Sequence, residues 1–238
     1  MKLFPAIDIK NGQCVRLKQG KFHEVSIYSD SPAEIAKTWE SQGASYIHIV
    51  DLDGALLGQS ANDEAIKNIV KNINIPIQVG GGIRTIKDIE NKLSLGVERV
   101  IIGTKAVKDP GFVKEAIEKF GADHIVVGID AKNGMVAVEG WEEISNSNAV
   151  ELALSMKRYG VKTIVYTDIS KDGMLQGPNV QCTEEMIDKT GLDIIASGGV
   201  TTLKDLEKLK DINSYGAIIG KALYENKISL ENAIDLFE

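Results

Sequence analysis

The chain has 238 residues, of which 43% are hydrophobic and 26% are charged, and its net charge is −7 at pH 7. A globular chain of this size buries enough apolar surface to fold without disulfides or a structural metal. The negative net charge argues against a broad nucleic-acid-binding surface, and no apolar run approaches the ~18 residues of a membrane span.

Short apolar runs alternate with longer amphipathic segments along the whole chain. The apolar runs are rich in Ile and Val, which is typical of strands buried on both faces of a parallel sheet. In chain order, the predicted strands are 3–7, 46–50, 75–79, 99–102, 125–129, 163–166, 193–196 and 217–219. The predicted helices are 31–42, 62–72, 85–95, 111–120, 148–159, 183–190, 202–210 and 229–237. This strict alternation predicts an α/β fold, a single (β/α)₈ TIM barrel over residues 1–238, with a doubly wound open sheet as the alternative.

The chain also contains an internal repeat. IQVGGGIRTIKDIE at 77–90 matches IIASGGVTTLKDLE at 194–207, an offset of 117 residues (194 − 77). VIIGTKAV at 100–107 matches AIIGKALY at 217–224 at the same offset. A period of this length is too long for a solenoid repeat, so the match indicates a duplicated half of a domain.

We interpret the chain as two half-barrels, of about residues 1–120 and 121–238, that close into one barrel. Two independent α/β domains related by duplication are the alternative. Each would have only four strands, which leaves open sheet edges and a marginal core. The single barrel is therefore the favoured arrangement.

Glycine-rich turns follow four predicted strands, at equivalent positions in the two halves. Glycine lets backbone N–H groups approach an anion closely, and the helix N-terminus that follows favours negative charge. Tight strand-to-helix turns are the alternative for any single one of them, but the matched pairs favour a substrate with a phosphate at each end. The candidate phosphate and substrate ligands in and near these turns are Gly81, Gly82, Arg84, Gly103, Thr104, Gly177, Ser197, Gly198, Gly199, Gly220 and Lys221.

Two aspartates, Asp8 and Asp130, follow the first and fifth predicted strands, in the similar frames PAIDIKNG and VGIDAKNG. Side chains that follow barrel strands face one common mouth, so we expect the two carboxylates on opposite sides of it. There they suit acid–base chemistry, in which one group donates a proton and the other accepts one. A turn-forming aspartate before Lys-Asn-Gly is the structural alternative for each.

Other polar residues near the expected mouth have both a chemical and a structural interpretation. Asp51, Thr167 and Asp172 are candidate substrate ligands or orienting groups, and helix or turn capping is the alternative for each. His48 lies in the second predicted strand, where it faces either the substrate or the core.

Two long connections, 10–30 and 131–147, follow the first and fifth strands, and alternating segments within them predict small hairpins. Connections of this length in a compact barrel are usually functional lids. We expect Arg16 on the first connection to pair with a phosphate and Trp141 on the second to stack on a planar ring.

Several kinds of site have no counterpart in the sequence. There is no His/Cys cluster at metal-ligand spacing and no nucleotide-binding fingerprint, so we expect neither a metal nor a cofactor. Pro5 and Asp8 come too early for a signal peptide, and Cys14 and Cys182 are too few and too far apart for a disulfide framework. We therefore expect a cytoplasmic protein with no membrane segment.

The chain resembles the phosphoribosylformimino-5-aminoimidazole carboxamide ribotide isomerases of histidine biosynthesis, through motifs that cover nearly all of it. These motifs are PAIDIKNGQCVRL, HIVDLDGA, VGGGIR, IIGTKAV, GIDAKNG, TDISKDGMLQGPN, ASGGV and IIGKALYE. The resemblance implies a cofactor-free Amadori rearrangement of the bis-phosphorylated aminoaldose ProFAR to the aminoketose PRFAR, with no obligatory protein partner. It also implies Asp8 as the general base, Asp130 as the general acid, and Thr167 and Asp172 as groups that hydrogen-bond the sugar, with Asp172 a rival for the acid.

The resemblance leaves alternatives. The cyclase subunit of imidazole glycerol phosphate synthase is the nearest relative, but Pro5-Ala6 and Gly140-Trp141 depart from its pattern and favour the isomerase. A dual-substrate isomerase that also acts on phosphoribosylanthranilate is a second enzymatic alternative. A non-catalytic phosphosugar-binding barrel is the non-enzymatic one, and the presence of both Asp8 and Asp130 argues against it.

Overall fold

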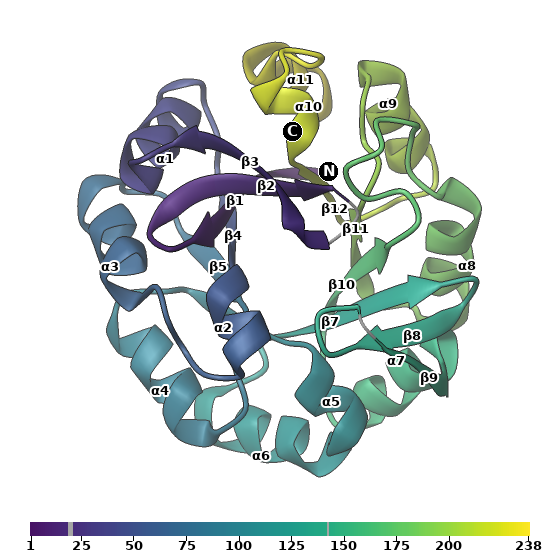
Figure 1. Ribbon diagram of the computed structural model, residues 1–238. Coiled ribbons are helices and arrows are strands. Elements are labelled where there is room, and N and C mark those ends of the chain that lie inside the picture. Colours follow the sequence, from purple (N-terminus) through teal and green to yellow (C-terminus); the bar gives the residue numbers. More distant parts are fainter. Residues whose placement is uncertain (19–20, 142) are drawn as a thin grey trace.

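Eight parallel strands form a closed barrel in the computed structural model, which describes residues 1–18, 21–141 and 143–238 (Figure 1). The barrel strands are β1 (Lys2–Lys10), β4 (Ile47–Asp51), β5 (Ile77–Gly80), β6 (Arg99–Ile102), β7 (Ile125–Lys132), β10 (Thr163–Asp168), β11 (Asp193–Ser197) and β12 (Gly216–Ile219). The last strand pairs with the first, for example Ala217 with Leu3, and this pairing closes the ring. The predicted (β/α)₈ barrel is confirmed, and the open-sheet alternative is wrong.

Helices surround the barrel and follow the strands in the predicted order (Figure 1). The eight predicted helices are present as α1 (Pro32–Ser41), α3 (Asp63–Asn72), α4 (Ile86–Ser94), α6 (Pro110–Phe120), α7 (Ala149–Arg158), α8 (Val180–Thr190), α9 (Leu203–Asp211) and α11 (Leu230–Phe237). Local signals fix their starts. The Ser31 side chain caps α1 by accepting from the Glu34 N–H, and the Asp88 carboxylate accepts from the Thr85 N–H at the start of α4.

Three further helices were not predicted from the sequence. They are α2 (Leu52–Leu57), α5 (Thr104–Lys108) and α10 (Lys221–Tyr224), and each directly follows a barrel strand. Segments this short do not complete enough turns to show a helical period in the sequence. They matter because they lie where strands β4, β6 and β12 end, which is where the predicted site residues are found.

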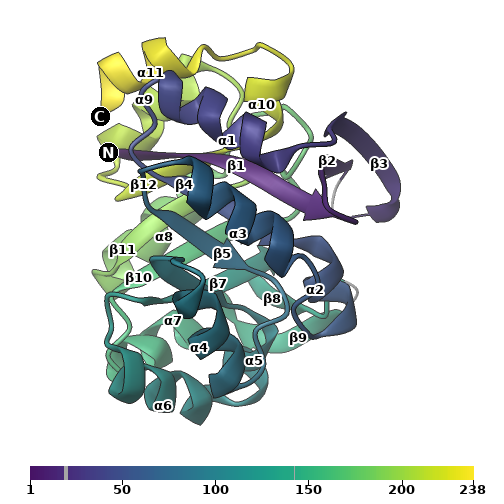
Figure 2. The ribbon, with the colours of Figure 1, turned by 90° about the vertical axis from the view of Figure 1, so that its left-hand side faces the viewer.

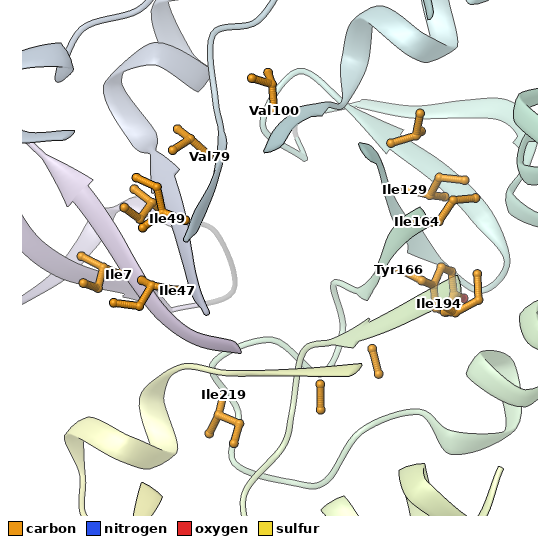
Figure 3. Close-up of a cluster of buried hydrophobic side chains, with 14 of the residues drawn as sticks. Ile7, Ile47, Ile49, Val79, Val100, Ile129, Ile164, Tyr166, Ile194 and Ile219 are labelled. Atoms are coloured by element: carbon orange, nitrogen blue, oxygen red, sulfur yellow. The ribbon is translucent and has the colours of Figure 1, made fainter. Parts of the chain in front are cut away.

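The core has two layers, which explains why the strands are apolar on both faces. One cluster lies between the strands and the helices and includes Ile7, Ile47, Ile49 and Val100 (Figure 3). A second, smaller cluster fills the barrel interior, and its members are Phe4, Ala6, Tyr46, Ile101, Val126, Val165, Ile195 and Ile218. Alternate residues of a strand therefore pack into different layers.

Two hairpins continue from the ends of strands β1 and β7. The first comprises β2 (Gln13–Lys18) and β3 (Lys21–Ser29), and the second comprises β8 (Met135–Val138) and β9 (Glu143–Asn148). Each begins at an Asn-Gly turn in which both residues have positive φ, 50° and 76° for the first and 53° and 77° for the second, as tight hairpin turns require. Both predicted hairpins are confirmed.

The chain ends meet at the opposite end of the barrel from the first hairpin and α2 (Figure 2). The Met1 ammonium donates to the Phe237 carbonyl oxygen at 2.9 Å, and the Leu3 N–H donates to the Glu238 carboxylate at 2.6 Å. No helix in the described part of the chain has the length and hydropathy needed to cross a bilayer.

Candidate active site

One cavity opens at the carboxyl ends of the barrel strands, between the two hairpins. Strand ends, glycine-rich turns and both hairpins contribute to its wall. The predicted site residues that line it are Asp8, Arg16, His48, Gly81, Gly82, Arg84, Gly103, Thr104, Asp130, Trp141, Thr167, Asp172, Ser197, Gly198, Gly199, Gly220 and Lys221. Residues from the two halves of the sequence are thus brought to one place, as barrel closure predicts.

Asp8 lies near the end of β1 and forms an ion pair with Arg16 of the first hairpin. Arg16 Nη1 is 2.9 Å from Asp8 Oδ2, and the two side chains are only 10% and 13% exposed. Burial raises the pKa of Asp8 to about 6, although Arg16 opposes the shift and the nearby Asp172 carboxylate adds to it. A carboxyl with this pKa is ionised at neutral pH yet is a stronger base than an ordinary aspartate.

Asp130 occupies the equivalent position at the end of β7 but has different partners. The indole Nε1–H of Trp141 donates to Asp130 Oδ2 at 2.8 Å, and Thr167 lies beside it on the neighbouring strand β10. Burial raises the pKa of Asp130, whereas the hydrogen bonds from Trp141 and Thr167 lower it and the Asp172 carboxylate raises it. The expected position of Trp141 at the mouth is found, but its bond to Asp130 was not anticipated.

The backbone explains how Trp141 reaches this position. Glu139, Gly140 and Trp141 have φ values of 53°, 64° and 75°, so three consecutive residues adopt the left-handed conformation. Only Gly140 does so at little cost. The Trp141 N–H donates to the Val138 carbonyl oxygen at 3.0 Å, which closes this tight turn and directs the chain back over the cavity.

Asp172 is the third carboxyl in the cavity, and two cations act on it electrostatically. Burial raises its pKa, and Arg16 and Lys221 oppose that shift. The Lys221 ammonium donates to the Gly173 carbonyl oxygen at 3.2 Å, so it stays near the Asp172 turn. Because the Asp172 carboxylate raises the pKa of both Asp8 and Asp130, it lies within electrostatic reach of both.

The glycine-rich turns are required by close backbone packing in both halves. A Cβ on Gly81 would lie 2.1 Å from the Asp51 carbonyl oxygen, and one on Gly198 would lie 2.8 Å from the Asp168 carbonyl oxygen. Gly82 and Gly199 are equally crowded, and all four have positive φ. The tight-turn interpretation is therefore correct for these four residues, and their place in the cavity wall leaves a role in anion binding open to them as well.

Gly103 and Gly220 have nearly the same backbone conformation but different surroundings. Their φ and ψ values are −98° and −108° for Gly103 and −105° and −104° for Gly220. No atom lies within 4 Å of a Cβ built on Gly103, whereas one on Gly220 would lie 2.2 Å from Arg16 Nη2. The turn at Gly103 is therefore open, whereas the turn at Gly220 is covered by the guanidinium group of Arg16, which pairs with Asp8.

Two polar residues follow the glycine-rich turns of the first half and line the cavity: Arg84 after Gly81-Gly82 and Thr104 after Gly103. Arg84 Nη2 is 3.5 Å from Glu139 Oε2, and the Lys108 ammonium also pairs with Glu139. The hydroxyl of Thr104 accepts from the Glu139 N–H at 3.1 Å. The second hairpin is thus linked through Glu139 to residues that follow the glycine-rich turns of the first half.

Two predicted ligands lie outside the cavity, and the structural alternative describes them. Asp51 is fully buried and accepts hydrogen bonds from the N–H groups of Gly54, Ala61 and Asn62 at 2.8, 3.0 and 3.1 Å. These bonds cap α2 and occupy the carboxylate, so Asp51 does not reach a ligand in the cavity. The Gly177 N–H donates to the Gly199 carbonyl oxygen at 3.0 Å, so Gly177 supports the Gly198-Gly199 turn without lining the cavity.

The sequence interpretation missed a pair of asparagines that brace both halves. Asn62 Nδ2 donates to Asp51 at 2.6 Å, and Asn179 Nδ2 donates to Asp168 at 2.6 Å. The two asparagines differ by 117 residues (179 − 62), which is the offset of the repeat. Extending the repeat across the gap between the matched motifs would have found them.

His48 lines the cavity from β4 and is almost completely buried, with 7% exposure. Its Nδ1 is 2.9 Å from Gln78 Nε2. Burial lowers its pKa to about 3, and the positive charges of Arg16 and Arg99 add to this effect. The ring is therefore neutral at physiological pH. Among the described residues, no group of three or more His, Cys, Asp or Glu is arranged to hold a metal ion.

The chain is similar over its full length to known proteins. A family model described as histidine biosynthesis protein matches residues 2–229. A protein of Lachnoclostridium phytofermentans is 72% identical over 238 residues, 100% of both chains. A protein of Alkaliphilus metalliredigens is 55% identical over 230 residues, 97% of each chain, and one of Syntrophomonas wolfei is 52% identical over 237 residues, 98% of this chain and 97% of its own. All three are named 1-(5-phosphoribosyl)-5-((5-phosphoribosylamino)methylideneamino)imidazole-4-carboxamide isomerase.

Proposed function

Because the chain belongs to the histidine biosynthesis protein family, we propose that it is an aldose–ketose isomerase that converts ProFAR to PRFAR by an Amadori rearrangement. The observation that carries the proposal is the pair of glycine-rich turns on either side of a cavity that holds three carboxyl groups. The name of the relatives describes a molecule with two phosphoribosyl groups. A substrate with a phosphate at each end matches a cavity with two such turns.

The two phosphate groups are proposed to bind at the two turns. In the first half, Gly81, Gly82 and Gly103 present backbone to the cavity, and Arg84 supplies a positive charge at the rim. In the second half, the corresponding groups are Ser197, Gly198, Gly199, Gly220 and Lys221. Backbone N–H groups at such turns bind anions without a net positive charge on the protein, so the net charge of −7 does not oppose this function.

Asp8 is proposed as the general base. The reaction requires removal of the proton at C2′ after the aminoribose ring has opened to a Schiff base. With a pKa of about 6, Asp8 is mostly ionised at pH 7 and holds a proton more strongly than an ordinary aspartate does. Arg16, 2.9 Å away, keeps the charged form available and becomes free for a phosphate when Asp8 is protonated.

Asp130 is proposed as the general acid that protonates the ring oxygen, with Thr167 and Asp172 beside the reacting sugar. Its raised pKa supports a proton-carrying role. Trp141 donates to Oδ2, so an acidic proton on Asp130 would reside on Oδ1. Asp172 also has a raised pKa and lies within reach of both other carboxyls, which makes it the rival for this step.

The reaction is proposed to need no protein partner and to take place in the cytoplasm. Every group assigned to acid–base chemistry comes from this one chain, which supports the first statement. Cys14 and Cys182 are both free thiols, which supports a reducing compartment.

The test is a spectroscopic assay of the purified protein with ProFAR, and then with phosphoribosylanthranilate. We expect turnover of ProFAR to PRFAR. Turnover of both substrates would indicate the dual-substrate isomerase instead. Formation of imidazole glycerol phosphate from PRFAR and ammonia would indicate the cyclase, and tight binding of ProFAR without turnover would indicate a binding protein.

A further inference from the structure

Three polar side chains form a line across the interior of the barrel, below the cavity. His48, Gln78 and Arg99 come from adjacent strands β4, β5 and β6, and they occupy the same level, because His48 pairs in register with Gln78 and Gln78 with Arg99. Their exposed fractions are 7%, 0% and 8%. Only His48 of the three lines the cavity.

The hydrogen bonds along this line have only one consistent direction. Arg99 Nη2 donates to Gln78 Oε1 at 2.8 Å, and a guanidinium group has donors only, so Oε1 is an acceptor. The amide group that Gln78 turns toward His48 is then the NH₂ group, with Nε2 2.9 Å from His48 Nδ1. Since that group can only donate, His48 Nδ1 must accept and carries no proton.

Arg99 is held so that it stays in this line. Its guanidinium carbon lies 4.6 Å from the centroid of the Tyr46 ring and 5.6 Å from that of the Phe4 ring. These cation–π contacts accommodate a positive charge in the barrel interior. Because an arginine does not lose its proton in a protein, the donor that orients Gln78 is permanent.

We propose that Gln78, oriented by Arg99, locks His48 in the Nε2–H tautomer, so that the imidazole presents a neutral hydrogen-bond donor to an oxygen atom of the bound substrate. Gln78 and Arg99 are then positioning residues, and His48 is the group that touches the ligand. This proposal rests on the proposed function for the identity of the ligand, but the tautomer itself does not.

The surroundings of His48 agree with a ring that carries one proton. Burial and the two arginines, Arg16 and Arg99, all lower the pKa of His48, so it does not take up a second proton at working pH. Protonation would also place an N–H against the NH₂ group of Gln78, where two donors would face each other. With Nδ1 occupied, only the Nε2 edge remains for a group bound in the cavity.

The first test is heteronuclear NMR of the histidine ring nitrogens in the whole, ligand-free protein, which has three histidines. We expect His48 to show a protonated Nε2 and an unprotonated Nδ1. His124 provides an internal reference, because its Nδ1 lies 2.7 Å from the Glu98 carbonyl oxygen and must be the donor there. The His124→Gln and His23→Gln variants assign the signals. A His48 ring that is protonated on Nδ1, or on both nitrogens, would overturn the proposal.

The second test changes the direction of the line. In Gln78→Glu, the carboxylate can only accept, from Arg99 and from His48, so at pH 8 the proton of the neutral ring is expected to move to Nδ1. The cavity then loses its donor, and kcat/KM is expected to fall about tenfold to a hundredfold, the usual effect of one such bond. If His48 keeps the Nε2–H tautomer in Gln78→Glu, the proposal is overturned.

A matched pair of variants separates orientation from packing. Arg99→Lys keeps a donor for Gln78 Oε1, whereas Arg99→Met removes it and lets the amide turn over. We expect the Nε2–H tautomer to persist in Arg99→Lys and to become mixed in Arg99→Met, with kcat/KM lower in the second. If both variants melt earlier but keep the wild-type tautomer, the role of Arg99 is merely structural and the proposal is wrong.

These tests also separate this proposal from the proposed function. The Nε2–H tautomer in a protein that does not convert ProFAR would overturn the function and support the locked tautomer. Turnover of ProFAR by a protein whose His48 is protonated on Nδ1 would support the function and overturn the locked tautomer.

Discussion

The two halves of the barrel share a frame and differ in the groups that the frame carries. In both, an aspartate at the end of a strand is braced by an asparagine, as in Asp51 with Asn62 and Asp168 with Asn179. In both, the next helix begins at a threonine, and an aspartate in its first turn accepts a hydrogen bond from the backbone N–H of that threonine, Asp88 from Thr85 and Asp205 from Thr202. The two halves thus share the hydrogen bonds found beside their glycine-rich turns.

The differences lie in the cavity. Asp8 and Asp130 occupy equivalent strand ends, but Asp8 is paired with the cation Arg16 and Asp130 with the neutral indole of Trp141. Asp172 corresponds in the repeat to Asp53, but Asp53 accepts hydrogen bonds from the Asn11 N–H and from Asn62 Nδ2 and does not line the cavity. The comparison teaches that an approximately symmetric barrel can carry unlike acid and base groups, because each receives its partner from a different hairpin.

The largest expected effect is the loss of the two strand-end carboxylates. Asp8→Asn is expected to reduce kcat by about a thousandfold or more, since it removes a positioned base, while ProFAR still binds. Asp130→Asn is expected to have a similar effect if Asp130 is the acid. Steady-state kinetics measures both, and circular dichroism checks folding. Full loss in Asp172→Asn with retained activity in Asp130→Asn would transfer the acid role to Asp172.

A large effect on stability is expected at a buried lysine that only the first half contains. Lys92 is fully buried, and its ammonium is 2.5 Å from Asp63 and 3.9 Å from Asp51. At the equivalent positions the second half has Leu209 and Val180. Lys92→Leu is expected to lower the free energy of unfolding by about 2 kcal/mol, because it removes the direct partner of the half-exposed Asp63 and the cation nearest to the fully buried Asp51. Urea denaturation measures this.

The double variant Lys92→Leu with Asp63→Val reproduces the arrangement of the second half and controls the preceding experiment. It is expected to recover at least half of the lost stability, because Asp51 keeps its bonds to Asn62 and to backbone N–H groups. Equal stability of the wild type and the single variant would show that the ion pair contributes nothing and that this difference between the halves is neutral.

A smaller effect, on the pH dependence of kcat/KM, is expected from removing the hydrogen-bonding partner of Asp8 or of Asp130. Arg16 lowers the pKa of Asp8, so Arg16→Gln raises that pKa and moves the rising, acidic limb of the kcat/KM profile to higher pH from its wild-type position near 6. Trp141 lowers the pKa of Asp130, so Trp141→Phe moves the falling, alkaline limb to higher pH. Activity at the optimum should fall about tenfold in each.

The profile of each variant serves as the control for the other. If Trp141→Phe moved the acidic limb, the assignment of base and acid to the two halves would be reversed. If Arg16→Gln moved the alkaline limb as well, the acid would be Asp172, whose pKa Arg16 also lowers. A limb that does not move in either variant would place its titrating group elsewhere in the cavity.

The smallest effect is expected at the two glycines that begin the short helices. A methyl group on Gly103 meets no protein atom within 4 Å, so Gly103→Ala is expected to keep the melting temperature and to raise KM severalfold by occupying space for a phosphate. Gly220→Ala would push Arg16 away from Asp8 and is expected to lower kcat as well. An unchanged KM in Gly103→Ala would remove the first turn from the substrate site.

The sequence predicts the frame well because its signals are local and repeated. The capping residues Ser31 and Thr85 and the Asn-Gly turns at 11–12 and 133–134 act within a few residues of where they lie. The sequence leaves two roles open for Asp51 for a related reason. An aspartate after a strand suits both a ligand and a cap, and only its complete burial decides between them.

The contacts that tune the site depend on how distant segments meet. The bond from Trp141 to Asp130 requires three consecutive left-handed residues, which the composition of that segment does not reveal. The line from Arg99 through Gln78 to His48 requires the register of three strands and their inward orientation. Neither follows from hydrophobic periodicity, which specifies which face of a strand is apolar and not which polar groups meet inside a barrel.

The meeting of Met1 with Phe237 and of Leu3 with Glu238 has a consequence for how the gene could be rearranged. The ends are adjacent and lie away from the cavity (Figure 2), so a short linker could join them. A new start at Gly121, between the halves, would then exchange their order in the chain and leave every cavity residue in place. We expect such a circular permutant to fold to the same barrel.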